Sequence, residues 1–182
     1  MKNALILHGI MGRAGGNWMQ WLHDELTKRS YKVLMPQLPN PDHPDRNGWL
    51  GFLKNITKDI DFLQLTIVGH SLGVTSALDL IESENKVLKL LISVSGFSKP
   101  YGLELNEYFL KIKKIDMKKA GSLIKKVVVI HSDNDPYVAQ WALKDLADSF
   151  GVDPIIIKNG GHINSGAGFT KFPFLLELLK EK

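Results

Sequence analysis

One five-residue pattern, Gly69-His70-Ser71-Leu72-Gly73, constrains the fold of this chain more than any other stretch. An apolar run at residues 65–68 precedes it, and a helical pattern at residues 74–81 follows it. Between a strand and a helix, G-x-S-x-G marks a turn so sharp that the positions flanking the serine must lack a side chain. Such a turn lifts the Ser71 hydroxyl above the sheet edge and directs the Leu72 N–H at the same point. The alternative is a glycine-rich turn that binds a phosphate or no ligand.

Apolar runs and helical patterns alternate along the whole chain, which predicts an α/β fold with parallel strands joined by crossover helices. The length of 182 residues, without an internal repeat or linker, fits one domain over residues 1–182. We expect strands at residues 4–7, 31–35, 65–68, 87–94, 126–130 and 154–157. We expect helices at residues 17–27, with Asn17 as the cap, and at 49–63, 74–82, 138–150 and 172–179. Residues 95–125 are the least regular part and include a lysine-rich helix.

The composition narrows the chemistry and the partners. The chain has no cysteine, which excludes disulfides, thiolate metal sites and a cysteine nucleophile, so a nucleophile has to be serine. The net charge of +4 comes largely from lysines at residues 111–126 and near 28–29, without interleaved aromatics or arginine clusters. We therefore expect a solvated basic face and no nucleic-acid partner. The apolar run at residues 4–7 is too short for a signal-peptide core and no run reaches membrane-spanning length, which predicts a cytoplasmic protein with no membrane partner.

Two stretches suggest a cofactor or a metal but do not fit one well. Glycines 9, 12, 15 and 16 follow the first strand, yet they lack the G-x-G-x-x-G spacing of a dinucleotide site. An oxyanion loop fits these glycines better. Asp42, His43 and Asp45 lie in a loop with three prolines, where polar residues are usually solvated. We therefore expect neither a metal nor a cofactor.

Chemically useful side chains follow the ends of several predicted strands. His8, Ser71, either Asp133 or Asp135, and His162 come directly after such strands. In a parallel sheet they gather at the carboxyl edge, where open α/β sheets carry their sites. Ser71 is then the nucleophile, His162 the base that takes its proton, and one aspartate the group that orients the imidazole. We expect the histidines at positions 8, 70 and 131 to be structural.

The chain order Ser, Asp, His is that of the α/β-hydrolase superfamily. The chain resembles its compact branch, the serine hydrolases of the RBBP9/YdeN type, over nearly the whole length. The motifs that carry the resemblance are the strand followed by His8-Gly9, the segment 18–22, the loop 36–44 followed by Trp49, the G-x-S-x-G turn, Ser132-x-x-Asp135-Pro136-Tyr137-Val138, and Gly160-Gly161-His162. This resemblance implies one domain with a six-stranded parallel sheet in the order 2-1-3-4-5-6, helices on both faces and no separate lid domain. It also places the acid just before Pro136, which favours Asp135 over Asp133.

These features predict a serine hydrolase that cleaves a small ester or amide through an acyl-serine intermediate. We expect a carboxylesterase-like activity, with an amidase or aminopeptidase type as the variant. The oxyanion hole should use the backbone N–H groups of Leu72 and Ile10, with Met11 as the fallback donor, because the first strand lies beside the nucleophile strand. The alternative from another class is a protein-binding module that keeps the fold, and an intact Ser71, Asp135 and His162 argue against it.

The aromatic stretch after the fourth strand is the candidate for the acyl pocket. Phe97, Tyr101, Leu103 and Phe109 leave the sheet next to the nucleophile strand, so we expect them to cap the site and to bind substrate. A cap this short encloses only a short or medium acyl group. The alternative is that these aromatics pack in the core or at a dimer contact.

Overall fold

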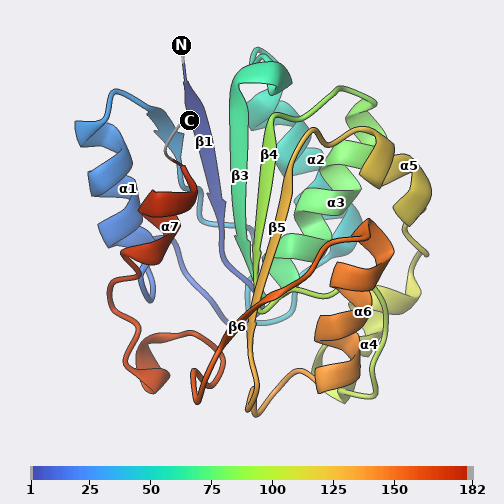
Figure 1. The fold of residues 1–182 in the computed structure, drawn as a ribbon. Helices are drawn as coiled ribbons and strands as arrows, with labels where there is room; N and C mark the ends of the chain where they lie inside the picture. The colour runs from blue at the N-terminus through green and yellow to red at the C-terminus, as the bar shows by residue number, and fades with distance from the viewer. Residues whose placement is uncertain (1, 180–182) are drawn as a thin grey trace.

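Six parallel strands form one sheet in the order β2-β1-β3-β4-β5-β6 (Figure 1). This computed structural model describes residues 2–179. The strands are β1 Asn3–Leu7, β2 Lys32–Leu34, β3 Leu65–His70, β4 Leu90–Val94, β5 Val127–Ser132 and β6 Ile155–Ile157. Every neighbouring pair is parallel. The expected strand order and direction are confirmed.

Helices cover both faces of the sheet (Figure 1). One face carries α1 Met19–Lys28 and α7 Phe174–Leu178, and the other carries α2 Arg46–Thr57, α3 Leu72–Glu84, α4 Glu104–Lys111, α5 Met117–Ser122 and α6 Gln140–Phe150. Short 3-10 helices occur at Phe62–Gln64 and Ser165–Ala167. Successive side chains of a strand point to opposite faces. Ile67 of β3 therefore packs in the α2–α3 layer, while Val68 packs in the α1–α7 layer.

Several local expectations are wrong. The helix expected at 49–63 is instead α2, which ends at Thr57, followed by a separate 3-10 helix at Phe62–Gln64. The fourth strand begins at Leu90 rather than at 87, because Val87 is exposed and Leu88 forms only an isolated bridge to Ile124. Asn17 does not cap α1: the helix begins two residues later, and its N-cap position makes no side-chain hydrogen bond. Residues 95–125 contain two helices, α4 and α5, so this segment is more regular than the sequence indicates.

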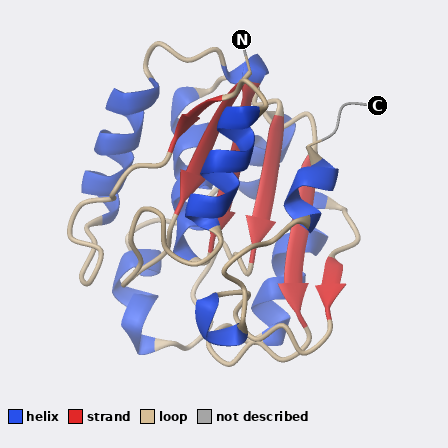
Figure 2. Cartoon of the chain, turned by 90° about the vertical axis from the view of Figure 1, so that its left-hand side faces the viewer, coloured by secondary structure: helices blue, strands red, loops and turns tan. Residues whose placement is uncertain are grey.

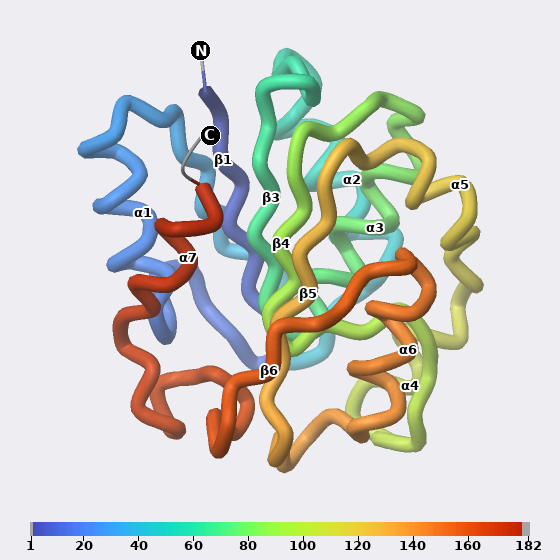
Figure 3. Tube along the Cα trace, viewed as in Figure 1, coloured from blue at the N-terminus to red at the C-terminus, as the bar shows by residue number. Residues whose placement is uncertain are grey.

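The carboxyl ends of the strands meet at one edge of the molecule, and loops gather there (Figure 2). After β6 the chain runs below this edge and returns to the layer of α1, where it forms α7 (Figure 3). The segment between β6 and α7 carries His162. Its path brings His162 from the edge strand β6 to the end of the central strand β3, where His70 Nε2 lies 2.9 Å from the carbonyl oxygen of His162.

Candidate active site

Ser71 lies on a sharp turn between β3 and α3, where the sequence pattern predicts it. Its backbone has φ 55° and ψ −127°, a region that residues other than glycine seldom adopt. A Cβ added to Gly73 would lie 2.6 Å from the carbonyl oxygen of His8, and one added to Gly69 would lie 3.0 Å from the Cα of Val74. The first distance excludes a side chain, and the second leaves room for one only if the start of α3 shifts. The two glycines therefore allow the turn to form.

The loop after β1 packs directly against this turn. A Cβ on Gly9 would lie 2.9 Å from the Cβ of Ser71 and 3.2 Å from the backbone nitrogen of Leu72. The Met11 N–H donates to the carbonyl oxygen of Pro41 at 2.7 Å, whereas the Ile10 N–H makes no hydrogen bond with a described residue. Of the two candidate donors in this loop, Ile10 is therefore the one still available to a ligand.

His162 forms a hydrogen bond with one aspartate of the loop after β5. Its Nδ1 lies 2.8 Å from Oδ2 of Asp135, whose side chain is fully buried. Oδ1 of Asp135 accepts from the N–H groups of Tyr137 at 2.9 Å and Val138 at 3.0 Å. Burial acts to raise the pKa of Asp135, but the bond to His162 and these two N–H groups outweigh it and hold that pKa below its ordinary value. This carboxyl group is therefore ionised at neutral pH.

Asp133, the competing aspartate, lies elsewhere. Its Oδ1 accepts from the backbone N–H of Asn159 at 2.8 Å, and Oδ1 of Asn134 accepts from the N–H of Gly161 at 2.8 Å. The hydroxyl of Ser132 also donates to the carbonyl oxygen of Gly161. The last residue of β5 and the two residues that follow it thus hold the loop that leads to His162.

The backbone has a positive φ on both sides of His162, and it is strained at Ile163. Gly161 has φ 54° and Ile163 has φ 47°, and a positive φ is unusual for a β-branched residue. The Trp18 indole N–H donates to the carbonyl oxygen of Ile163 at 2.9 Å. Buried contacts therefore hold a conformation that the loop would not adopt alone.

His70 supports the same loop from the end of β3. Its Nε2 donates to the carbonyl oxygen of His162 at 2.9 Å, and its ring lies 4.7 Å from the His162 ring. Burial and the nearby His162 lower the pKa of His70 to about 3. The ring is therefore neutral and keeps its Nε2 proton for this bond.

This burial predicts how stability depends on pH. His70 is neutral in the folded protein but titrates in the unfolded chain. The free energy of unfolding therefore falls as pH drops from about 6.5 towards 3. The loss approaches about 1.4 kcal/mol per pH unit for one such group. Urea unfolding between pH 7 and 4.5 should give a flatter profile for His70→Gln than for the unmodified protein. Burial also lowers the pKa of His8, so some slope persists in the variant. Equal slopes in the two proteins would contradict the assignment.

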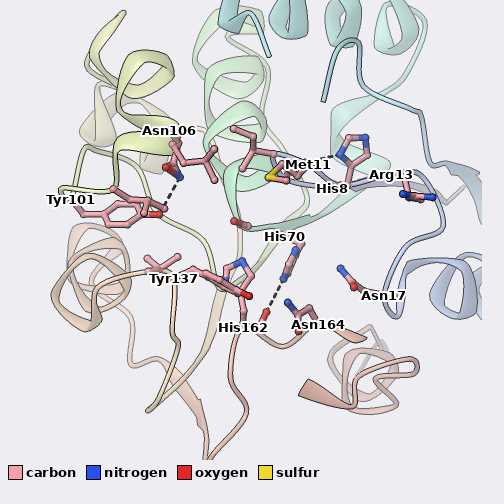
Figure 4. Close-up of a pocket in the computed structure, with 17 residues that line it drawn as sticks. His8, Met11, Arg13, Asn17, His70, Tyr101, Asn106, Tyr137, His162 and Asn164 are labelled. Carbon is pink, nitrogen blue, oxygen red and sulfur yellow. Dashed lines mark hydrogen bonds between the residues drawn. The ribbon is translucent and has the colours of Figure 1, made fainter. Parts of the chain in front are cut away.

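Ser71 and His162 open into one cavity of about 500 Å³ at the carboxyl edge (Figure 4). Tyr101 and Leu103 line it, as expected. Phe97 and Phe109 do not, and both are fully buried. The cavity also has lining residues that the sequence reasoning missed: Arg13, Asn17, Leu105, Asn106, Tyr137, Val138 and Asn164.

The two buried phenylalanines support the cavity wall from behind. The Phe97 ring meets the Tyr101 ring edge-on at 4.8 Å, and the Phe109 ring meets Trp49 of α2 at 5.4 Å. Their predicted role in contacting substrate is therefore wrong, because only the segment before α4 and its first turn face the cavity. Phe97 and Phe109 both pack in the core, which is the alternative that the sequence left open for them.

Comparison with known proteins assigns the family. A family model described as serine hydrolase matches residues 4–181. The chain belongs to the serine hydrolase family.

The chain is similar to YdeN of Bacillus subtilis, a protein named as a hydrolase. That relative is 29% identical over 181 residues, covering 98% of this hydrolase and 94% of YdeN. The YdeN crystal structure matches with a TM-score of 0.91 at 28% identity, over 98% of this chain and 97% of that one. A carboxylesterase structure from Nitrososphaera gargenis matches with a TM-score of 0.70 at 14% identity, over 98% and 88% of the two chains. The expected YdeN type is confirmed, and the more distant likeness shows the fold.

Residues 97–111, which include α4 and the cavity-lining Tyr101 and Leu103, form a segment that we call the cap, and a buried ion pair anchors it. The Arg46 guanidinium of α2 donates to both carboxylate oxygens of Asp79 in α3, at 2.7 and 3.0 Å. Its third nitrogen donates to the carbonyl oxygens of Phe109, Leu110 and Lys113, at 3.2, 3.1 and 2.7 Å. These carbonyls lie in and just after the last turn of α4. One buried cation thus joins the C-terminal end of the cap helix to α2 and α3.

The proline-rich loop of the hydrolase has structural contacts. The Asp45 side chain caps α2 by accepting from the Gly48 N–H, and the His43 ring stacks on Tyr108 of α4 at 4.4 Å. No cluster of three or more metal-ligating side chains occurs within residues 2–179. Among the helices of the same residues, none has the length and apolar character to span a bilayer.

Proposed function

We propose that this serine hydrolase cleaves a small ester or amide through an acyl-serine intermediate, with Ser71, His162 and Asp135 as its catalytic triad. The observation that carries the proposal is the His162–Asp135 hydrogen bond beside a serine on a strained turn, both opening into the same cavity. The bond occupies Nδ1 of His162, so Nε2 is the nitrogen left to exchange a proton with Ser71. No cofactor takes part.

The proposed reaction has two halves. Ser71 Oγ attacks the carbonyl carbon while His162 Nε2 takes the hydroxyl proton, and the Leu72 and Ile10 N–H groups stabilise the oxyanion. The oxyanion collapses, the bond to the leaving group breaks, and His162 donates its proton to that alcohol or amine. Water then attacks the acyl-serine with His162 as base, which releases a carboxylic acid and regenerates Ser71. The negative charge of Asp135 stabilises the imidazolium that forms in each half.

The size of the cavity favours a short or medium acyl group in the substrate. Its volume of about 500 Å³ lies in the lower part of the range for small-molecule sites. A carboxylesterase-like activity is the first choice, and the structural neighbour from Nitrososphaera gargenis is described as a carboxylesterase. An amidase or aminopeptidase type is the variant that the same triad would allow.

A fluorophosphonate probe tests the proposal directly. We expect one probe per chain, mapped by peptide mass spectrometry to Ser71, because such probes react only with an activated serine. A panel of acyl p-nitrophenyl esters and aminoacyl amides then ranks the substrate classes. A folded protein that is not labelled, or is labelled at another serine, would contradict the mechanism and favour a binding module.

Residues in the cavity wall and residues behind it should respond differently to truncation. Leu103→Ala should raise KM about threefold to tenfold for hexanoyl esters and leave acetyl esters nearly unchanged, because it removes apolar contact with the longer chain. Phe109→Ala, the matched core change, should lower the free energy of unfolding by about 3–5 kcal/mol. Kinetics across acyl lengths and urea unfolding measure the two effects. An unchanged chain-length profile in folded Leu103→Ala would place the acyl pocket elsewhere.

A further inference from the structure

Two asparagines give the cavity a wall of hydrogen-bond donors. Oδ1 of Asn17 accepts from the N–H and the hydroxyl of Ser165, at 3.0 and 3.1 Å. Oδ1 of Asn164 accepts from the N–H of Ala167 at 3.0 Å. Each amide oxygen already accepts a hydrogen bond, whereas neither amide nitrogen donates one to a described residue, so the nitrogens are available to a ligand. Both residues line the cavity, on the side away from Tyr101 (Figure 4).

Arg13 adds a positive charge on the same side (Figure 4). It is the only lysine, arginine, aspartate or glutamate among the residues that line the cavity. Arg13 is exposed, and its guanidinium makes no hydrogen bond or ion pair with any residue from 2 to 179. No acidic side chain that lines the cavity therefore pairs with this charge.

The loop that carries Arg13 is held in place. The Gly16 N–H donates to the carbonyl oxygen of Arg13 at 3.0 Å, which closes a turn. The Ala14 N–H donates to Oε1 of Gln37 at 2.9 Å, and Met11 is bound to Pro41 as described above. The base of the Arg13 side chain is thus fixed beside the cavity, while its guanidinium is available.

This side of the cavity offers one cation and two amide donors, and no charged acceptor lines it. These groups match a ligand with an anionic oxygen group. A planar carboxylate suits the guanidinium fork, which can bind both oxygens at once. A neutral substrate would gain no such contact and would leave the exposed guanidinium to water, and a cationic one would be repelled. The wall formed by Arg13, Asn17 and Asn164 thus distinguishes substrates by charge.

We propose that this wall binds a carboxylate of the substrate, so that the preferred substrates are esters or amides that carry a free carboxylate on one side of the scissile bond. This inference rests on the proposed hydrolase mechanism and specifies its substrate class. Arg13 is the specificity-determining residue, and Asn17 and Asn164 complete its hydrogen bonding.

Two matched pairs of esters test the inference. In the first pair, the p-nitrophenyl monoester of glutaric acid is compared with p-nitrophenyl pentanoate, after subtraction of spontaneous hydrolysis. In the second, 4-carboxyphenyl butyrate is compared with 4-carbamoylphenyl butyrate, which moves the carboxylate to the leaving group. We expect a preference for the acidic member of one pair, and Arg13→Gln should reduce kcat/KM for that member about tenfold or more. The neutral members should change less than twofold.

Lys118→Gln is the matched control, because it removes one exposed positive charge from α5, outside the cavity. It should leave the acidic preference intact. If Arg13→Gln changes the acidic and neutral members of both pairs equally, or if the unmodified protein prefers neither acidic ester, the inference is wrong.

A binding measurement distinguishes failure of the carboxylate-binding inference from failure of the proposed hydrolase mechanism. Calorimetric titration of Ser71→Ala with the N-phenyl monoamide of glutaric acid and with N-phenylpentanamide reports charge preference without chemistry. Tighter binding of the acid, lost on adding Arg13→Gln, supports the wall even if no ester is hydrolysed. Equal binding of the two amides by Ser71→Ala, together with labelling of Ser71 by the fluorophosphonate probe in the unmodified protein, would overturn the wall and leave the mechanism standing.

Discussion

Replacing Ser71 with alanine should reduce kcat/KM for every ester substrate about a thousandfold or more, because the proposed nucleophile is lost and only binding and the oxyanion donors remain. The turn itself should persist. Its backbone contacts, from the Ser71 N–H to the Val94 carbonyl oxygen at 2.9 Å and from the Val74 N–H to the Ser71 carbonyl oxygen at 3.0 Å, do not use the hydroxyl. Steady-state hydrolysis and urea unfolding of the same preparation measure both expectations.

Ser76→Ala is the matched control. Like Ser71→Ala it removes a buried serine hydroxyl, here from α3, the helix that follows Ser71. The Ser76 hydroxyl donates to the Leu72 carbonyl oxygen at 3.4 Å, a long bond within the helix. Activity should stay near that of the unmodified protein. Substantial hydrolysis by a folded Ser71→Ala protein, after removal of contaminating esterases, would refute the acyl-serine mechanism.

The second large effect concerns the two aspartates after β5. Asp135→Asn should reduce kcat on the order of ten-thousandfold. The new amide oxygen would still accept from the Tyr137 and Val138 N–H groups, which leaves its NH2 group facing Nδ1 of His162. Nδ1 would then have to accept a hydrogen bond, so the ring proton would move to Nε2. A histidine in that tautomer has no lone pair for the serine proton.

Asp133→Asn is the paired change, and we expect less than a tenfold loss of activity. An asparagine oxygen can still accept from the Asn159 N–H, so the loop that leads to His162 should hold. Kinetics at pH 8, with unfolding curves for both variants, compare the two directly. A greater loss of activity in Asp133→Asn would transfer the acid role to that residue.

Much of the fold was predictable because continuous apolar runs alternate clearly with helical patterns that have a period of 3.6 residues. The rule that functional residues follow the carboxyl ends of parallel strands places Ser71 and His162 at one edge, and the structure brings both into one cavity. The role of each in catalysis stays a prediction. The same rule could have suggested Arg13, which lies in the loop after β1, and Asn164, which lies in the loop after β6.

Other features depend on contacts between distant segments. Asn17 has the spacing of a helix cap, but its oxygen binds Ser165, which is 148 positions away. Such a tertiary bond overrides local capping preference and leaves no trace in the periodicity. Phe109 was misplaced for a similar reason. The cavity ends at the first turn of α4, where Leu105 lines it, and one turn later the helix packs on Trp49.

The anchoring of α4 by Arg46 bears on how substrate range could diversify among proteins of this fold. A cap attached only by its two chain ends could be exchanged as a module, by recombination or by design. Here the end of the cap helix is bound to a guanidinium from α2 whose charge is balanced by Asp79 of α3. A transplanted segment that offers its carbonyl groups in another geometry would leave a buried cation without full hydrogen bonding, which is costly. New specificities should therefore arise more readily by point substitution within the existing cap than by replacement of the segment, unless positions 46 and 79 are exchanged with it.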